Sequence, residues 1–130
     1  MPLHEINPKS IAPPFSNYSH AIAVDPRMRM LFVSGQLGLN SQGVFVKGFR
    51  AQFEQAMLNL EAVLSEADMT TDNLVKLTVL SAVADDEAVR AYRDIRDERI
   101  MGHAPAALFS IVTAFTHPDI LVEVEAVAAK

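Results

Sequence analysis

The sequence predicts an α+β domain in which two helices cover one face of a mixed β-sheet. Short apolar runs near both ends of the chain are typical of strands, whereas two central stretches repeat apolar residues every three or four positions. The predicted order is strands, helix, strand, helix, strands, and two helices are enough to cover one face of such a sheet only. The 130 residues correspond to a single domain, 1–130.

The N-terminal part is predicted to contain short strands. The first 20 residues include Pro8, Pro13 and Pro14 and are expected to form an extended arm with turns. Apolar runs at 21–24 and 30–34 flank residues 25–27, Asp-Pro-Arg, which predicts a hairpin because Pro26 sets the backbone angle of the turn. A third short strand is predicted at 44–46.

The next elements are a helix and a strand. The helix begins at Phe49, where the spacing changes to three and four, and its apolar stripe is expected to pack on the sheet. Residues 74–83 are rich in β-branched and aliphatic side chains and are predicted to form a buried strand. The stripe consists of Phe49, Phe53, Met57, Leu60 and Leu64.

A second helix is predicted over 85–100, with acidic residues at its N-terminus, where the helix dipole favours negative charge. Arginines recur every three residues along it, and steps of three turn about 300° around a helix, so they do not share one face. We interpret most of them as a solvated face, with ion pairs expected from Asp86 to Arg90 and from Arg93 to Asp97.

Two strands, 107–114 and 121–128, are predicted to close the chain. Alternation in the second places Glu123 and Glu125 on the face opposite Val122 and Val124. The strands are too apolar for a sheet face left fully in water, so an oligomer that covers this face is inferred.

Composition excludes several classes of function. The chain has no cysteine, which excludes disulfides and thiolate metal sites. Its net charge of −5, without a basic face, argues against nucleic-acid binding. The apolar stretches are too short to span a membrane, and the N-terminus lacks the pattern of a secretory signal, so a cytoplasmic protein is expected.

Few residues suggest chemistry directly. The four histidines lack metal-ligand spacing, so no metal and no cofactor are expected, although ligands from distant parts of the chain stay an open alternative. Tyr18 precedes the first predicted strand. Gly35 ends the second, where a glycine lets a ligand approach the backbone. Glu123 is placed where a carboxylate could hold a water or act as a general base.

Five segments spread over nearly the whole chain carry a family resemblance. They read YSHA at 18–21, LFVSGQ at 31–36, NLEAVL at 59–64, LVKLTV at 74–79 and VEVEAVA at 122–128. Their order resembles the Rid family, the reactive-intermediate deaminases also called YjgF-type proteins and formerly L-PSP endoribonucleases.

The resemblance implies a chorismate-mutase-like fold, a homotrimer, and small-molecule clefts between subunits. It also implies hydrolysis of imines or enamines such as 2-aminoacrylate to a keto acid and ammonia. By the same resemblance, Tyr18 lines the cleft, Gly35 supplies backbone contact and Glu123 positions the attacking water. Whether Glu123 or Glu125 enters the cleft depends on a one-residue choice of alignment.

The sequence departs from the family pattern in the first motif, with Ser16-Asn17 in place of Gly-Pro and His20 in place of glutamine, and at the start of the penultimate strand. Family deaminases read Pro-Ala-Arg-Ser at the start of the penultimate strand, where an arginine holds the substrate carboxylate, whereas this chain has Ala107 and Leu108. Standard 2-aminoacrylate activity is therefore not expected. Two alternatives follow: Arg90 supplies a cation from another direction, or Leu108 makes the cleft apolar and suited to a different carbonyl compound.

Three functions are compatible with these residues. The first is a divergent imine or enamine hydrolase that uses Glu123. The second is a non-catalytic trimer that binds a small metabolite in the same clefts. The third, an endoribonuclease or translation inhibitor, follows only from the older family label, and the acidic composition argues against it.

Overall fold

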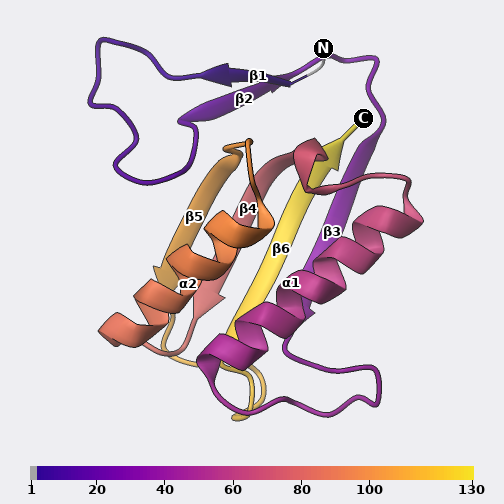
Figure 1. Ribbon diagram of the computed structural model, residues 1–130, viewed down its shortest axis with the longest axis vertical. Helices are drawn as coiled ribbons and strands as arrows, with labels where there is room; N and C mark the ends of the chain where they lie inside the picture. The colour runs from indigo at the N-terminus through magenta and orange to yellow at the C-terminus, as the bar shows by residue number, and fades with distance from the viewer. Residues whose placement is uncertain (1–2) are drawn as a thin grey trace.

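Two helices lie side by side on one face of a four-stranded sheet in the computed structural model, which describes residues 3–130 (Figure 1). A separate two-stranded ribbon of β1 and β2 lies beyond one end of the sheet (Figure 1). The predicted α+β class is therefore confirmed. The elements are β1 Leu3–Ile6, β2 Ala21–Val24, β3 Met30–Leu37, α1 Phe49–Glu66, a short 3₁₀ helix Thr71–Asn73, β4 Leu74–Ser81, α2 Asp86–Arg99, β5 Ala106–Ile111 and β6 Val122–Ala129.

The strand order in the sheet is β3-β6-β4-β5. The last strand of the chain, β6, is a central strand and runs antiparallel to both β3 and β4. Strands β4 and β5 are parallel, so the chain needs a long connection between them, and α2 forms that connection. Strand β5 is consequently an edge strand beside α2.

The core lies between the sheet and the helices. Alternate β6 side chains, beginning with Val122 and Val124, are buried on the helix side. The five residues of the predicted stripe on α1 are all buried, which confirms that expectation. At the start of α2, the Asp85 carboxylate accepts a 2.8 Å hydrogen bond from the Ala88 amide and caps the helix.

The predicted hairpin of 21–24 with 30–34 is wrong. The turn forms, because the Asp25 carboxylate accepts hydrogen bonds from the Arg27 amide and guanidinium. However, Arg29 then exchanges two backbone hydrogen bonds with Lys130, which aligns β3 with β6. Strand β2 pairs instead with β1, a strand inside the N-terminal arm that was expected to be extended with turns.

The strand predicted at 44–46 is also wrong. Residue Phe45 forms only an isolated bridge with Leu39 within a loop. The preceding turn is closed by the Asn40 side chain, which accepts from the amides of Gln42 and Val44. Local side-chain bonding therefore replaces a regular ladder here.

The sheet face opposite the helices is uncovered in the single chain (Figure 1). It carries large apolar side chains, including Phe32, which is 75% exposed, and Leu108, which is 50% exposed. Apolar residues exposed in this number on one face mark a surface suited to association.

Candidate functional site

Two of the sequence-predicted residues, Gly35 and Glu123, lie together on the uncovered sheet face. Glu123 is on β6, opposite Leu37 of β3 and Leu80 of β4. A Cβ atom built on Gly35 would lie only 2.6 Å from Cδ of Glu123. The Glu123 side chain therefore lies directly against the Gly35 backbone. Any larger residue at position 35 would fill this space with its own side chain.

Glu123 and Glu125 have different surroundings. Glu123 is partly buried, whereas Glu125 is exposed and lies opposite Thr78. Within residues 3–130 no side chain forms a hydrogen bond or ion pair with the Glu123 carboxylate. Its oxygens are therefore available to a water or a ligand.

Two more predicted residues, Tyr18 and Leu108, line a cavity of about 350 Å³. The cavity lies between the N-terminal arm, α2 and β5. Its aromatic wall is ordered by the Tyr92 ring, which stacks on Phe109 with 4.3 Å between ring centroids. The full lining is Phe15, Ser16, Tyr18, Val89, Tyr92, Arg93, Arg96, Ala107, Leu108 and Phe109.

One of the two arginines that line this cavity, Arg96, is buried, although most arginines of this helix were expected to form a solvated face. Its side chain is 5% exposed and lies 5.0 Å from the Tyr92 ring centroid. It donates from Nε to Asp97 at 3.0 Å, from Nη2 to Ser16 at 3.2 Å and from Nη1 to the Tyr92 hydroxyl at 3.4 Å. One signal could have revealed it: Ala88, Tyr92 and Arg96 follow at intervals of four on the buried side of α2.

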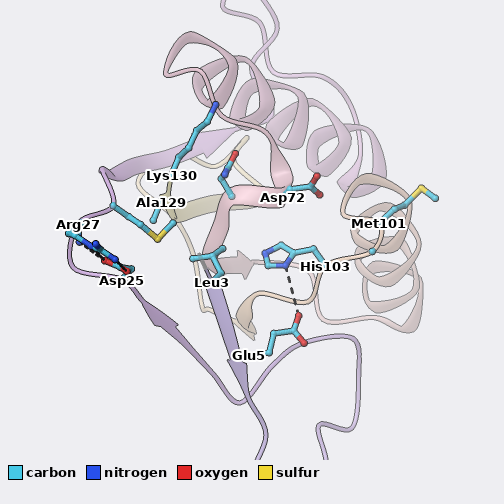
Figure 2. Close-up of a pocket in the computed structure, with 12 residues that line it drawn as sticks. Leu3, Glu5, Asp25, Arg27, Asp72, Met101, His103, Ala129 and Lys130 are labelled. Atoms are coloured by element: carbon cyan, nitrogen blue, oxygen red, sulfur yellow. Dashed lines mark hydrogen bonds and ion pairs between the residues drawn. The ribbon is translucent and has the colours of Figure 1, made fainter. Parts of the chain in front are cut away.

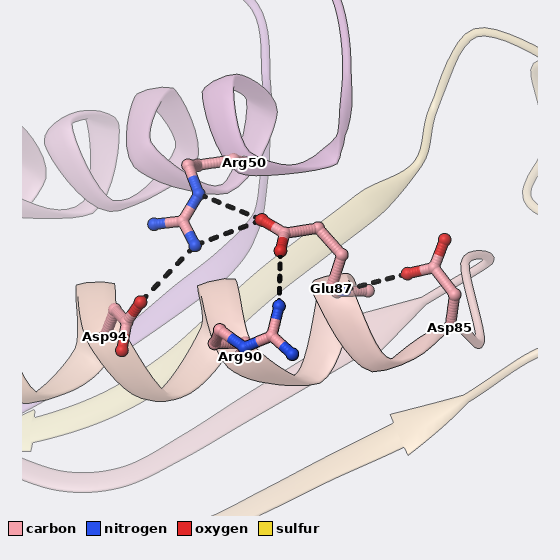
Figure 3. Close-up of polar contacts among 6 residues, drawn as sticks. Arg50, Asp85, Glu87, Arg90 and Asp94 are labelled. Carbon is pink, nitrogen blue, oxygen red and sulfur yellow. Dashed lines mark hydrogen bonds and ion pairs between the residues drawn. The ribbon is translucent and has the colours of Figure 1, made fainter.

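Arg90, the predicted compensating cation, does not line this cavity. It donates from Nη1 to Oε2 of Glu87 at 2.8 Å, and that carboxylate also accepts from Arg50 on α1 (Figure 3). Asp94 contributes a second contact to Arg50, at 3.3 Å (Figure 3). The network is exposed and links the two helices.

The two ion pairs predicted within α2 are wrong. Asp86 was expected to pair with Arg90, but Arg90 pairs with Glu87, three residues before it. Asp97 was expected to pair with Arg93, but it accepts from Arg96.

A larger hollow of about 960 Å³ lies between the β1–β2 ribbon and the end of the main sheet (Figure 2). His103 points into it, 4.0 Å from Glu5, while its other ring nitrogen is 2.6 Å from the Leu74 carbonyl oxygen (Figure 2). On its rim, the Arg27 guanidinium holds the pKa of Asp25 at about 2. None of the predicted site residues lines this hollow.

The described residues offer no metal centre. Among residues 3–130, no group of three histidine, aspartate or glutamate side chains is arranged to hold an ion. No helix in this part of the chain has the length and apolar character needed to cross a membrane.

The sheet separates Glu123 from most of the cavity within one chain. Ala107 pairs with Leu77, and Leu77 pairs with Ala126, a register that places all three on the helix side. Glu123 is three residues from Ala126 and therefore points to the other face. Tyr18 and Leu108 are brought together at one edge, and Gly35 and Glu123 elsewhere on the open face.

The fold and these two groups of residues define a class of α+β protein with a mixed sheet, one open face and a ligand-sized cavity at the sheet edge. Residues 9–130 match the family model described as Endoribonuclease L-PSP. The chain belongs to this family, the Rid or YjgF family.

Three similar proteins illustrate the match. A 2-iminobutanoate/2-iminopropanoate deaminase from Mus musculus is 34% identical over 95% of this chain and 85% of its own length. A RutC family protein from Aquifex aeolicus is 37% identical, and the match spans 59% of this chain and 60% of that protein. The crystal structure of the Rid family protein YyfB from Yersinia pestis superimposes with a TM-score of 0.88 at 30% identity, over 100% of both chains.

Proposed function

We propose that this protein hydrolyses a small imine or enamine to a carbonyl compound and ammonia, in a cleft between subunits of a homotrimer. The observation that carries the proposal is the approach of Glu123 to Gly35, which places a carboxylate without a side-chain partner among residues 3–130 against open backbone. Membership of a family that includes 2-iminobutanoate/2-iminopropanoate deaminases supports the choice of reaction.

The chemistry requires one water and one group that moves its protons. The Glu123 carboxylate accepts a proton from water as the water oxygen bonds to the imine carbon, and the C=N double bond becomes a C–N single bond. That proton passes to the nitrogen and gives an amino alcohol. The carboxylate then takes the proton of the new hydroxyl group and delivers it to the nitrogen as the C–N bond breaks, so that ammonia leaves and the C=O bond forms. One water is consumed for each ammonia released, and no oxidant or reductant takes part.

The placement between subunits follows from the two sides of the sheet. Most of the Tyr18–Leu108 cavity lies on the helix side of the sheet, at the edge strand β5, whereas Glu123 lies on the open face of β6, with β4 between the two strands, so one chain alone does not bring them together. A second copy packed on the open face can bring its own Glu123 and Gly35 to the cavity edge at Leu108. The exposed apolar side chains of that face supply the driving force for such packing.

A second function, ligand binding without catalysis, is favoured by one residue. Ala107 stands where the family deaminases resembled by this sequence carry the arginine that holds a carboxylate. A cleft without that group could bind a metabolite and leave it unchanged. The first function predicts turnover that depends on Glu123, whereas the second predicts binding and no turnover.

The first test is ammonia release from imines generated in solution from amino acids by an amino-acid oxidase. We expect wild-type protein to accelerate release, and Glu123→Gln to reduce the acceleration at least 100-fold, because the amide cannot accept the proton. Glu125→Gln is the matched control, since it removes the same charge two residues along the same face and is expected to retain activity.

Each alternative has a distinct result. Loss of activity in Glu125→Gln with an active Glu123→Gln would assign the wrong carboxylate. A silent wild type that still binds the keto-acid products would favour the non-catalytic trimer.

A further inference from the structure

The edge cavity contains an excess of positive charge that the proposed reaction leaves unexplained. Arg93 and Arg96 both line it, and no aspartate or glutamate is among its lining residues. Arg93 forms no ion pair within residues 3–130. Within residues 3–130 the only acidic partner of Arg96 is Asp97, whose side chain lies outside the lining and is 54% exposed, so solvent weakens this ion pair.

Arg96 still has capacity for a ligand. A guanidinium carries five N–H donors. Nε and Nη2 are directed at Asp97 and Ser16, but Nη1 makes only a long, 3.4 Å bond to the Tyr92 hydroxyl. A carboxylate beside Nη1 would gain a short, charge-assisted hydrogen bond.

The remaining walls of the cavity are apolar. Val89, Leu108 and Phe109 line it, and the small side chain of Ala107 leaves room that a larger residue would fill. The volume of about 350 Å³ exceeds what a one- or two-carbon side chain needs, since a single water accounts for roughly 30 Å³ of liquid. The cavity therefore suits a branched or aromatic side chain.

We propose that Arg96 binds the carboxylate of the substrate, and that the substrates are 2-imino acids with a large hydrophobic side chain, which occupies the pocket beside Ala107. This inference rests on the proposed function and specifies its substrate class. It places the anion-binding group on α2 instead of on the penultimate strand. Arg96 is then a binding residue, and Ala107 determines specificity through its small size.

A purely structural role for Arg96 makes different predictions. In that case the guanidinium only ties Ser16 of the arm to α2, and its removal would lower stability without changing the preference among ligands. The test must therefore measure ligand selectivity in addition to unfolding.

The first measurement is calorimetric binding of three stable probes to the full-length protein. These are 4-methyl-2-oxopentanoate, its neutral counterpart 4-methyl-2-pentanone, and pyruvate. We expect the branched keto acid to bind at least tenfold more tightly than the ketone, which lacks the carboxylate, and than pyruvate, which lacks the side chain. Equal binding of any pair, or no binding of the branched keto acid, would overturn the proposal.

The second measurement uses variants of Arg96. Arg96→Gln should weaken binding of 4-methyl-2-oxopentanoate at least tenfold and leave 4-methyl-2-pentanone unchanged. Arg99→Gln is the control, because Arg99 lies on the same helix but pairs with Glu54 and Glu61 on α1. Adding Ala107→Arg to Arg96→Gln should restore affinity for pyruvate but not for the branched acid, since the new side chain fills the pocket.

If Arg96→Gln does not fold, Arg96→Lys keeps the charge without the planar fork and should bind the branched acid several-fold more weakly. Unchanged affinity in a folded Arg96 variant contradicts the proposal. Binding is measured without turnover, so a failed deaminase assay together with Arg96-dependent binding refutes the reaction alone. Turnover that depends on Glu123 but ignores Arg96 refutes only this inference.

Discussion

At the scale of single residues, the position of the Glu123 carboxylate depends on the absence of a side chain at Gly35. The nearest atoms to a Cβ at this position would be Cδ, Cγ and Oε2 of Glu123, all within 2.9 Å. These atoms belong to a flexible side chain, so the protein can accommodate a methyl group by moving the carboxylate. Function and stability are therefore separable here.

We expect Gly35→Ala to fold with nearly unchanged thermal stability but to lose ammonia release by at least tenfold, because Glu123 is displaced. Ser34→Ala, at the exposed neighbouring position, is the control and should remain active. The double variant Gly35→Ala/Glu123→Gln should be no slower than Glu123→Gln alone. Additive losses in this cycle would show that Gly35 acts independently of Glu123.

Sequence reasoning located part of the candidate site and missed another part for a physical reason. Tyr18 and Leu108, which were expected at a ligand cleft, line one cavity. The burial of Arg96 depends on Tyr92 and on the distant Ser16, a contact between the arm and α2 that no local pattern encodes. Arg90 has the same local sequence character and lies in an exposed network (Figure 3).

At the scale of elements, Gln52 connects α1 to two loops, one between β3 and α1 and the other between β5 and β6. Its amide is 2% exposed, and its nitrogen donates to the carbonyl oxygens of Val46 and Asp119 at 3.0 and 2.8 Å. Its oxygen accepts from the Leu121 amide at 3.0 Å, just before β6 begins. One side chain thus satisfies three backbone groups.

We expect Gln52→Leu to lower the free energy of unfolding by about 3 kcal/mol, because each orphaned buried group costs about 1–3 kcal/mol and water can reach some of them. Gln55→Leu is the control with a loss of less than about 1 kcal/mol, since Gln55 donates only to Asn59. Urea unfolding at equal protein concentration measures both values. Equal losses would show that the loops are held by other contacts.

The helices and the central strands were predictable because their periodicity reflects burial on one face. The helix from Phe49 and the cap at Asp85 illustrate this, since each depends on residues only a few positions apart. The pairing of β2 was not predictable, because its turn at Asp25 is compatible with a hairpin and the choice is made by Arg29 and Lys130, which are 101 residues apart. Strand partners are a property of the whole fold.

At the scale of the whole molecule, the open sheet face is expected to be the surface on which subunits associate. Phe32 is 75% exposed on this face, at the edge strand β3. We expect wild-type protein to sediment as a trimer and Phe32→Ser to dissociate it, since the contact loses buried apolar area. Val44→Ser, which removes a similarly exposed side chain from a loop, should leave the trimer intact. A monomeric wild type would contradict the assembly.

A site shared between copies predicts that two inactive variants restore each other. In Glu123→Gln the cavity with Arg96 is intact, whereas in Arg96→Gln the carboxylate is intact. When the two are unfolded and refolded together in equal amounts, about a quarter of the interfaces in a cyclic trimer pair an intact cavity with an intact Glu123. Ammonia release should recover to about that fraction of wild type, well above the residual rate of either variant refolded alone. Because the sheet lies between the two groups in one chain, a site confined to a single subunit would leave the mixture as inactive as its parts.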